Sequence, residues 1–219
     1  MAQPHSREWY AQIARELGTY QHPWTRHLDG PDPELTYDAL LSAVLSGDMW
    51  VLEAGCADGK DAARFGLHAS AWVGYDREPG FLDAAQQNAP DAAFTVWDGK
   101  GEIPSALRGP FDLIVSRRGP TSVIDHLRAL AAPGARFLYV GPDALNAPAL
   151  ARARLEAIGW TVLGEWSLRV RAWLPTEDDD RARSAFLGED HDPERWAATA
   201  ETRGRAYWEE RSVLLAAAN

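Results

Sequence analysis

Two short apolar runs joined by a glycine-rich turn restrict the fold of this chain more than any other feature. The first run opens the segment VLEAGCADGK, residues 51–60, and the second run, WVGYD, ends at Asp76. Such runs are typical of buried parallel strands. Small residues at Gly55, Ala57 and Gly59 leave room for a ligand beside the backbone of the turn. Because Asp76 follows about 20 residues later, it is placed to accept hydrogen bonds from ribose hydroxyls.

The spacing of the small residues separates two classes of ligand. A dinucleotide fingerprint reads G-x-G-x-x-G, whereas here the small residues alternate and an acid, Glu53, precedes them. The segment resembles the E/D-x-G-x-G-x-G signature of class I S-adenosylmethionine-dependent methyltransferases, with Ala57 in place of the middle glycine. The resemblance implies S-adenosyl-L-methionine as cofactor and S-adenosyl-L-homocysteine as product, and it disfavours a dehydrogenase. A methyl group at Ala57 suits the turn if its φ is negative.

Three further segments follow in the order of this family. Residues 94–99 resemble its third strand with an acid near the adenine, and residues 110–116 its fourth strand, whose tip faces the transferred methyl group. Residues 130–140 resemble its helix, Pro-Gly turn and fifth strand. The likeness covers residues 48–142. It implies cofactor contacts by Glu53, Gly55, Cys56, Ala57, Gly59, Asp76, Arg77, Asp98, Gly99 and Ser116.

Each of these residues also has an ordinary structural interpretation. Glu53 and Asp76 could be loop acids, and Asp98-Gly99 is a common turn dipeptide. Cys56 is the only cysteine, and it has no histidine nearby in the sequence, so a small residue packed behind the ligand is favoured over a nucleophile. The shared register of the motifs supports the functional interpretation.

Alternation of apolar runs with helical segments predicts an α/β fold. We expect a Rossmann-like, seven-stranded, mainly parallel sheet with helices on both faces and an antiparallel last strand. The expected strands are near residues 49–53, 71–76, 93–97, 111–116, 135–141, 160–173 and 211–216. The expected helices are near residues 7–17, 33–45, 59–67, 79–88, 120–131 and 147–158. Residues 1–219 are expected to form one domain, with an N-terminal helical extension (1–46), a cofactor-binding core (47–142) and a sheet-completing part (143–219).

Charge and composition favour a small acceptor over nucleic acid. The chain has 32 acidic residues against 22 lysines and arginines, and only two are lysines. This excess of acid opposes binding to a phosphate backbone. A lone cysteine forms no internal disulfide, and no apolar run reaches about 18 residues, so we expect a cytoplasmic protein without a membrane segment.

Two segments outside the core are expected to set specificity. They are the N-terminal extension, which contains Trp24, and an insertion at about residues 175–207, which contains Phe186 and Trp196. In related small-molecule methyltransferases such segments fold over the ligand and exclude water. Alternatively, Trp24, Trp196 and Trp208 only anchor short helices to the core. The acidic run at residues 177–180 is expected to begin a helix and not to bind a metal.

The predicted fourth-strand tip reads Ser116-Arg117-Arg118-Gly119-Pro120 and lacks the N/D-P-P-Y/F tetrapeptide of methyltransferases that act on bases. Arg117 and Arg118 could bind a carboxylate or phosphate of the acceptor, with Trp24 as a further substrate contact. The arginines could equally pair with Asp112, Asp125 or the acids of the insertion. His22, His27 and His126 are candidate bases by residue type alone, so the catalytic residues stay unassigned.

The sequence therefore predicts a methyltransferase that acts on a small molecule, which could be anionic. Two alternatives are an RNA methyltransferase acting on rRNA or tRNA, which needs a basic groove beside the turn, and a non-catalytic S-adenosylmethionine-binding protein. The sequence assigns neither the acceptor atom nor the oligomeric state.

Overall fold

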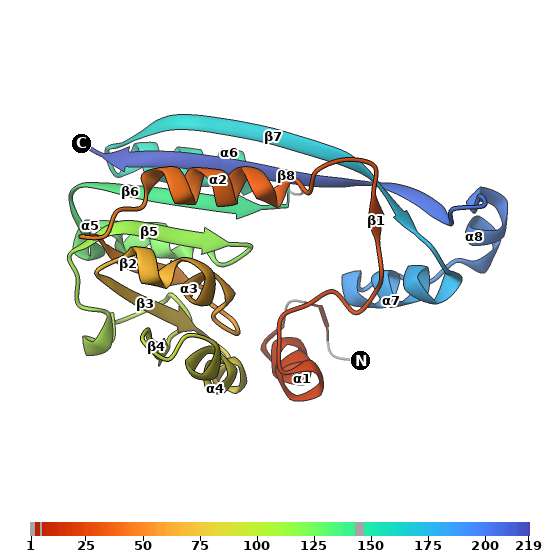
Figure 1. Cartoon of the computed structure of the whole chain (residues 1–219), viewed down its shortest axis with the longest axis horizontal. Helices are drawn as coiled ribbons and strands as arrows, with labels where there is room; N and C mark the ends of the chain where they lie inside the picture. Colours follow the sequence, from red (N-terminus) through yellow and green to blue (C-terminus); the bar gives the residue numbers. More distant parts are fainter. Residues whose placement is uncertain (1–2, 5, 143–146) are drawn as a thin grey trace.

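The computed structural model describes residues 3–4, 6–142 and 147–219. Within these residues, eight strands form one sheet in the order β1-β7-β8-β6-β5-β2-β3-β4 (Figure 1). The strands are β1 (His27–Leu28), β2 (Trp50–Ala54), β3 (Ala71–Asp76), β4 (Ala93–Val96), β5 (Phe111–Arg117), β6 (Ala131–Gly141), β7 (Trp160–Leu174) and β8 (Arg205–Ala218).

The helices flank this sheet and extend beyond one end of it. They are α1 (Arg7–Leu17), α2 (Glu34–Val44), α3 (Lys60–Phe65), α4 (Pro79–Asn88), α5 (Leu127–Leu130), α6 (Ala147–Ala157), α7 (Glu177–Leu187) and α8 (Pro193–Thr199). Short 3₁₀ turns are η1 (Gly66–His68), η2 (Ser105–Leu107) and η3 (Thr121–His126). The helix expected at residues 120–131 is therefore mainly the turn η3, followed by the four-residue α5. In the described part of the chain, no helix combines the length and the apolar character needed to cross a membrane.

The expected count of seven strands was wrong, because β1 adds an eighth at the sheet edge. In β1, His27 pairs with Trp173 and Leu28 with Ala172 of β7. A strand of two residues is too short to show an alternation of apolar and polar residues in the sequence. Strand β1 is therefore recognisable only by its pairing with β7. The seven expected strands are present. β6, β5, β2, β3 and β4 run parallel, and β8 lies antiparallel between β6 and β7.

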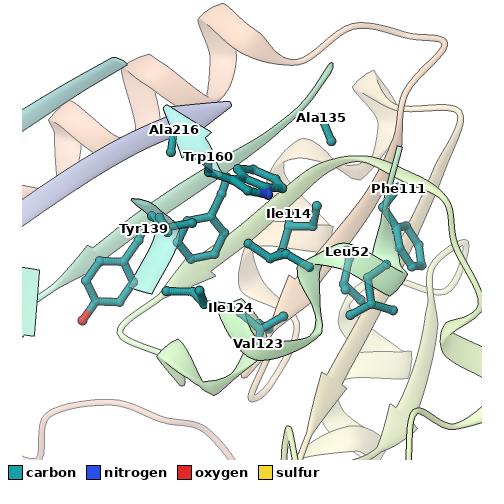
Figure 2. Close-up of a cluster of buried hydrophobic side chains, with 14 of the residues drawn as sticks. Leu52, Phe111, Ile114, Val123, Ile124, Ala135, Tyr139, Trp160 and Ala216 are labelled. Atoms are coloured by element: carbon teal, nitrogen blue, oxygen red, sulfur yellow. The ribbon is translucent and has the colours of Figure 1, made fainter. Parts of the chain in front are cut away.

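The core occupies both faces of the parallel strands. Successive side chains of a strand point to opposite faces. Leu52 and Ile114 therefore pack on one face with Ile124 of η3 (Figure 2), whereas Val51 and Leu113 pack on the other face, in the cluster that includes α2 and α3. All five side chains are buried. Burial on both faces explains why these strands appear as continuous apolar runs in the sequence.

The N-terminal segment and the insertion meet beyond the carboxyl ends of the parallel strands. β7 and β8 extend past the other strands and carry α7 and α8 at their far end (Figure 1). Phe186 of α7 contacts Trp9 of α1, with ring centroids 4.7 Å apart, and Trp24, at 5.2 Å. Phe81 of α4 belongs to the same buried group. We call Trp9, Tyr20, Trp24, Phe81 and Phe186 the aromatic cluster.

Candidate functional site

The turn after β2 has an unusual backbone. Its φ angles are 72° at Gly55 and 70° at Gly59, in the left-handed region that favours glycine. A Cβ at Gly55 would lie 2.5 Å from Cδ of Pro120, and one at Gly59 would lie 3.0 Å from Cα of Ala85. Both glycines are thus required by their backbone conformation and by protein packing, in addition to any close approach of a ligand.

Ala57 differs from the sequence expectation. Its φ is +43°, not negative, and a left-handed conformation costs a non-glycine residue about 1–2 kcal/mol. The N–H of Ala57 donates a 3.0 Å hydrogen bond to Oδ2 of Asp76, while Oδ1 of Asp76 accepts from the N–H of Glu78 at 2.9 Å. These bonds hold the turn against the end of β3, and they explain how alanine is accommodated.

A cavity of about 310 Å³ opens beside this turn, at the carboxyl ends of β2, β3, β4 and β5. Its volume is typical of a small-molecule site. The cavity is lined by seven of the expected cofactor residues: Glu53, Gly55, Cys56, Ala57, Asp76, Arg77 and Asp98. Gly59, Gly99 and Ser116 lie outside this lining. Of the expected substrate residues, Arg117 and Arg118 line the cavity and Trp24 does not.

The acids of the cavity differ in environment. Burial raises the pKa of Asp76, although its backbone hydrogen bonds oppose the shift. Burial and the neighbouring Asp61 raise the pKa of Glu53, whose Oε2 accepts a 2.8 Å hydrogen bond from the indole N–H of Trp72. Asp98 is exposed. Asp76 lines the cavity, and since a carboxylate oxygen can accept more than one hydrogen bond, it can accept further hydrogen bonds from a ligand.

Two further groups bear on the chemistry of the cavity. Burial raises the pKa of the Cys56 thiol, which opposes a role as a thiolate nucleophile. The hydroxyl of Tyr75 is buried, and no described residue forms a hydrogen bond with it. Since a buried polar group without a partner is costly, this hydroxyl is a natural contact for a bound ligand.

None of the three candidate histidines lines the cavity. Nε2 of His22 lies 3.3 Å from Nη1 of Arg118, and Nε2 of His126 lies 3.2 Å from the carbonyl oxygen of Gly99. His27 lies in the edge strand β1. The histidines that residue type alone pointed to are therefore not positioned as bases at this site.

Residues of the N-terminal segment line the cavity, and sequence reasoning missed them individually. Tyr10 and Tyr20 have ring centroids 5.7 Å apart, and the guanidinium of Arg77 lies 4.3 Å from the ring centre of Tyr10. Burial raises the pKa of both hydroxyls. The available signal was the aromatic residues of the extension, which predicted a covering segment but not which ring faces the site.

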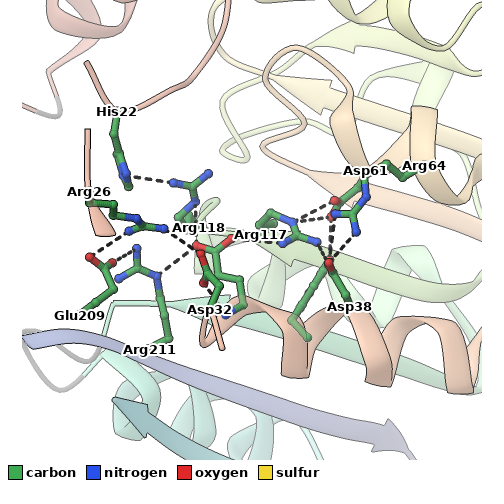
Figure 3. A network of polar contacts seen from close by, with 12 residues as sticks. His22, Arg26, Asp32, Asp38, Asp61, Arg64, Arg117, Arg118, Glu209 and Arg211 are labelled. Carbon is green, nitrogen blue, oxygen red and sulfur yellow. Dashed lines mark hydrogen bonds and ion pairs between the residues drawn. The ribbon is translucent and has the colours of Figure 1, made fainter. Parts of the chain in front are cut away.

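Arg117 is held by three carboxylates from two helices, α2 and α3 (Figure 3). Its Nε lies 2.9 Å from Oδ1 of Asp61, its Nη1 lies 3.1 Å from Oε2 of Glu34, and its Nη2 pairs with Asp38. The ring of Tyr37 lies 4.4 Å from the guanidinium carbon. Acids of α2 and α3, and not those expected from the sequence, are therefore its partners.

The expected partners have other contacts. Oδ2 of Asp112 accepts a 2.8 Å hydrogen bond from the backbone N–H of Trp50, and Asp125 pairs with Arg154 at 2.8 Å. In the insertion, Asp180 is fully buried and pairs with Arg205 of β8. The acidic run thus begins α7, as expected, and one of its members also anchors the helix to the sheet.

Solved structures share this architecture. Precorrin-6y C5,15-methyltransferase from Geobacter metallireducens superposes with a TM-score of 0.57 at 12% identity, covering 89% of this chain and 93% of that one. Precorrin 8w decarboxylase from Methanobacterium thermoautotrophicum gives 0.57 at 15% identity, over 90% and 97% of the two chains. These likenesses, with the turn and the sheet order, define a Rossmann-like fold of the methyltransferase type.

One match is much nearer in sequence. A functionally unknown protein from Deinococcus radiodurans R1 is 52% identical, with a TM-score of 0.87 over 96% of this chain and 99% of that one. The chain belongs to the same family as this protein. No family model matches the chain, and no curated protein matches it.

Proposed function

We propose that the protein is an S-adenosylmethionine-dependent methyltransferase that acts on a small molecule. The observation that carries the proposal is Asp76, a half-buried carboxylate that lines the cavity and fastens the glycine-rich turn, where it can accept hydrogen bonds from ribose hydroxyls. The fold of the methyltransferase type supports the same conclusion.

The residues of the cavity fit this cofactor. Asp76 would hold the ribose, Asp98 the adenine amino group, and Glu53 with the turn would lie near the methionine end. The unpartnered hydroxyl of Tyr75 offers one more polar contact inside the cavity. When bound, S-adenosylmethionine supplies an electrophilic methyl group on a sulfonium.

The protein itself has to align the acceptor and exclude water. Methyl transfer is an in-line displacement, so a well-oriented acceptor accounts for much of the rate. Tyr10 and Tyr20 line the cavity from the N-terminal segment, where they can help to exclude water, and the aromatic cluster joins that segment to α7. Because no candidate histidine reaches the cavity, we infer an acceptor atom that is nucleophilic without a histidine base.

The charge of the lining favours a small acceptor over RNA. Among the described residues that line the cavity, the cations Lys60, Arg77, Lys100, Arg117 and Arg118 face an equal number of acids: Glu53, Asp58, Asp61, Asp76 and Asp98. A balanced lining differs from the basic groove that a phosphate backbone requires. The alternative of a cofactor-binding protein without catalysis predicts the same binding but no transfer.

The deciding experiment is calorimetric titration with S-adenosylhomocysteine, run beside NAD. Micromolar binding of S-adenosylhomocysteine alone is expected, and a screen of small acceptors with S-adenosylmethionine carrying a labelled methyl group would follow. Binding of NAD alone, or of neither ligand, would overturn the proposal. Binding without transfer to any acceptor would favour the non-catalytic alternative.

A further inference from the structure

The adjacent residues Arg117 and Arg118, at the end of β5, differ in how far carboxylates of the protein neutralise their charge. Every guanidinium nitrogen of Arg117 lies against a carboxylate of Asp61, Glu34 or Asp38. Because three carboxylates of the protein already surround its charge, Arg117 attracts a ligand anion weakly and mainly holds the protein together. Arg117 is therefore a positioning residue for this corner of the cavity, although the sequence analysis treated both arginines as equal candidates for substrate binding.

Arg118 keeps donors available. Its Nη1 faces Nε2 of His22 at 3.3 Å. Its Nε lies 3.4 Å from Oε1 of Glu34 but is buried without a hydrogen bond, and no described residue accepts a hydrogen bond from its Nη2. The guanidinium carbon lies 5.5 Å from the ring centre of Tyr20, and both side chains line the cavity. A buried donor without a hydrogen bond points to a ligand that supplies the acceptor.

The charges around Arg118 are incompletely neutralised (Figure 3). Glu34 is its only carboxylate partner among the described residues, and Arg117 and Arg211 share that carboxylate. Arg211 has a second partner in Glu209, and Arg117 has two others. Arg118 is thus the arginine of this network with the least compensation.

The pKa of His22 is affected by the same incompletely neutralised positive charge. Burial first, then the charges of Arg118, Arg26 and Arg211, lower the pKa of His22 to about 3, against the opposing effect of Glu34. A neutral imidazole accepts from Arg118 through Nε2. Because the three arginines add to the effect of burial, their positive charge acts at this corner of the site, and an anion is stabilised there.

The backbone of Arg118 is also unusual. Its φ is +53°, which costs a non-glycine residue about 1–2 kcal/mol, and its N–H donates a 2.7 Å hydrogen bond to the carbonyl oxygen of Val140. A strained residue at the end of a strand beside a cavity is a recurrent feature of functional sites. This backbone conformation sets the direction of the chain directly after β5, which ends at Arg117.

We propose that Arg118 binds an anionic group of the methyl acceptor, a carboxylate or a phosphate, over the ring of Tyr20. The inference rests on the proposed function and names its substrate class. Tyr20 and Phe81, which both line the cavity, provide apolar surface next to the charged contact. The acceptor is accordingly a small organic acid or phosphate ester.

The test uses the full chain saturated with S-adenosylhomocysteine. Benzoate and inorganic phosphate are the anionic probes, and benzamide is the neutral counterpart of benzoate. Calorimetry is expected to give millimolar binding of at least one anion and at least tenfold weaker binding of benzamide. The nuclear magnetic resonance signals of the His22 ring are expected to shift with the anion, and the pKa of His22 to rise, because the anion offsets the charge of Arg118.

Variants decide whether Arg118 makes the contact. Arg118→Gln is expected to weaken anion binding at least tenfold, and Arg118→Lys, which keeps the charge, to weaken it less. Arg26→Gln is the matched control, because Arg26 pairs with Glu209 and Asp32 and does not line the cavity. It is expected to change anion affinity less than threefold.

The order of the titrations distinguishes a failure of the proposed function from a failure of the inference about Arg118. S-adenosylhomocysteine is titrated first into each variant, and similar affinities show that the variants are folded. Absence of this binding in the unmodified protein overturns the proposed function. Binding of S-adenosylhomocysteine without binding of either anion, or anion binding that Arg118→Gln leaves unchanged, overturns the inference about the acceptor alone.

Discussion

The hydroxyl of Thr19 donates a 2.6 Å hydrogen bond to Oδ2 of Asp58, and this contact joins the N-terminal segment to the glycine-rich turn. Nζ of Lys60 donates to the same hydroxyl at 3.0 Å. Thr19 follows Gly18, the residue that ends α1. The position of α1 and the shape of the turn are therefore linked, because Asp58 and Lys60 flank Gly59 and line the cavity.

Thr19→Val is expected to weaken the binding of S-adenosylhomocysteine. Valine keeps the shape of threonine but removes the hydroxyl, and the loss of one such hydrogen bond costs about 1 kcal/mol, a factor of about five in affinity. Calorimetric titration measures it. Thr161→Val is the control, because the Thr161 hydroxyl donates a hydrogen bond to exposed Asn219 and lies outside the cavity lining. Equal affinities for both variants would show that Thr19 does not support the turn.

Asp76→Ala is expected to reduce both cofactor affinity and stability. The loss of hydrogen bonds to ribose should weaken binding by about 1–3 kcal/mol. The N–H groups of Ala57 and Glu78 also lose their acceptor, so the melting temperature should fall. Titration and thermal unfolding measure the two effects, with exposed Asp83 of α4 replaced by alanine as the control. A lower melting temperature with unchanged affinity would assign Asp76 to the fold alone.

Glu34→Gln is expected to destabilise the protein by about 3–5 kcal/mol, as is usual when one partner of a buried ion pair is removed. The carboxylate is shared by Arg117, Arg118 and Arg211, whose charges lower its pKa to about 2 although burial opposes the charged form. Denaturant unfolding measures the change. Glu156→Gln breaks an exposed pair and should cost less than about 1 kcal/mol. Similar losses in the two variants would contradict the role of Glu34.

The sequence predicted those parts of the fold that local patterns determine. Apolar runs located the parallel strands, and the spacing of Glu53, Gly55 and Asp76 predicted residues that lie together at one cavity, because each pattern lies within one or two adjacent elements. Strand β1 was missed because its two residues become a strand only by pairing with β7. The positive φ of Ala57 was missed because it depends on the hydrogen bond from its N–H to Asp76.

Contacts between distant segments could not be predicted in the same way. The partners of Arg117 come from α2 and α3, which contribute Glu34, Asp38 and Asp61. An acid at any surface position offers the same sequence signal, and only the folded arrangement selects among them. The N-terminal segment and the insertion were expected to cover the site, but their meeting through Phe186 is a property of the tertiary structure.

His22 is expected to make stability depend on pH. Its pKa is about 3 in the folded protein and near its ordinary value of 6.5 in the unfolded chain, so the unfolded state binds the proton more tightly. Its contribution is fully present above about pH 6.5 and is lost as the pH falls toward 3, by at most about 1.4 kcal/mol per pH unit. His22→Gln removes this titration. Unfolding free energies measured from pH 6.5 to 4.5 should therefore fall more steeply in the unmodified protein, and parallel curves would contradict the shift.

Phe186→Ala is expected to loosen α1 and α7 together. The ring of Phe186 is 9% exposed and contacts Trp9 and Trp24, whereas neighbouring Leu187 is 38% exposed. Removing a buried phenylalanine ring costs about 3–5 kcal/mol where the site cannot collapse, and the loss should appear as local opening of the two segments that the ring joins. Hydrogen exchange followed by mass spectrometry measures this opening.

The same exchange experiment tests whether the aromatic cluster is one unit. Leu187→Ala, on the same helix, should leave exchange in α1 unchanged, because Leu187 lies outside the cluster. Faster exchange in both α1 and α7 of Phe186→Ala would show that the insertion holds the N-terminal segment over the cavity. Faster exchange in α7 alone would mean that α1 is held by Phe81 and by the bond from Thr19 to Asp58, without help from the insertion.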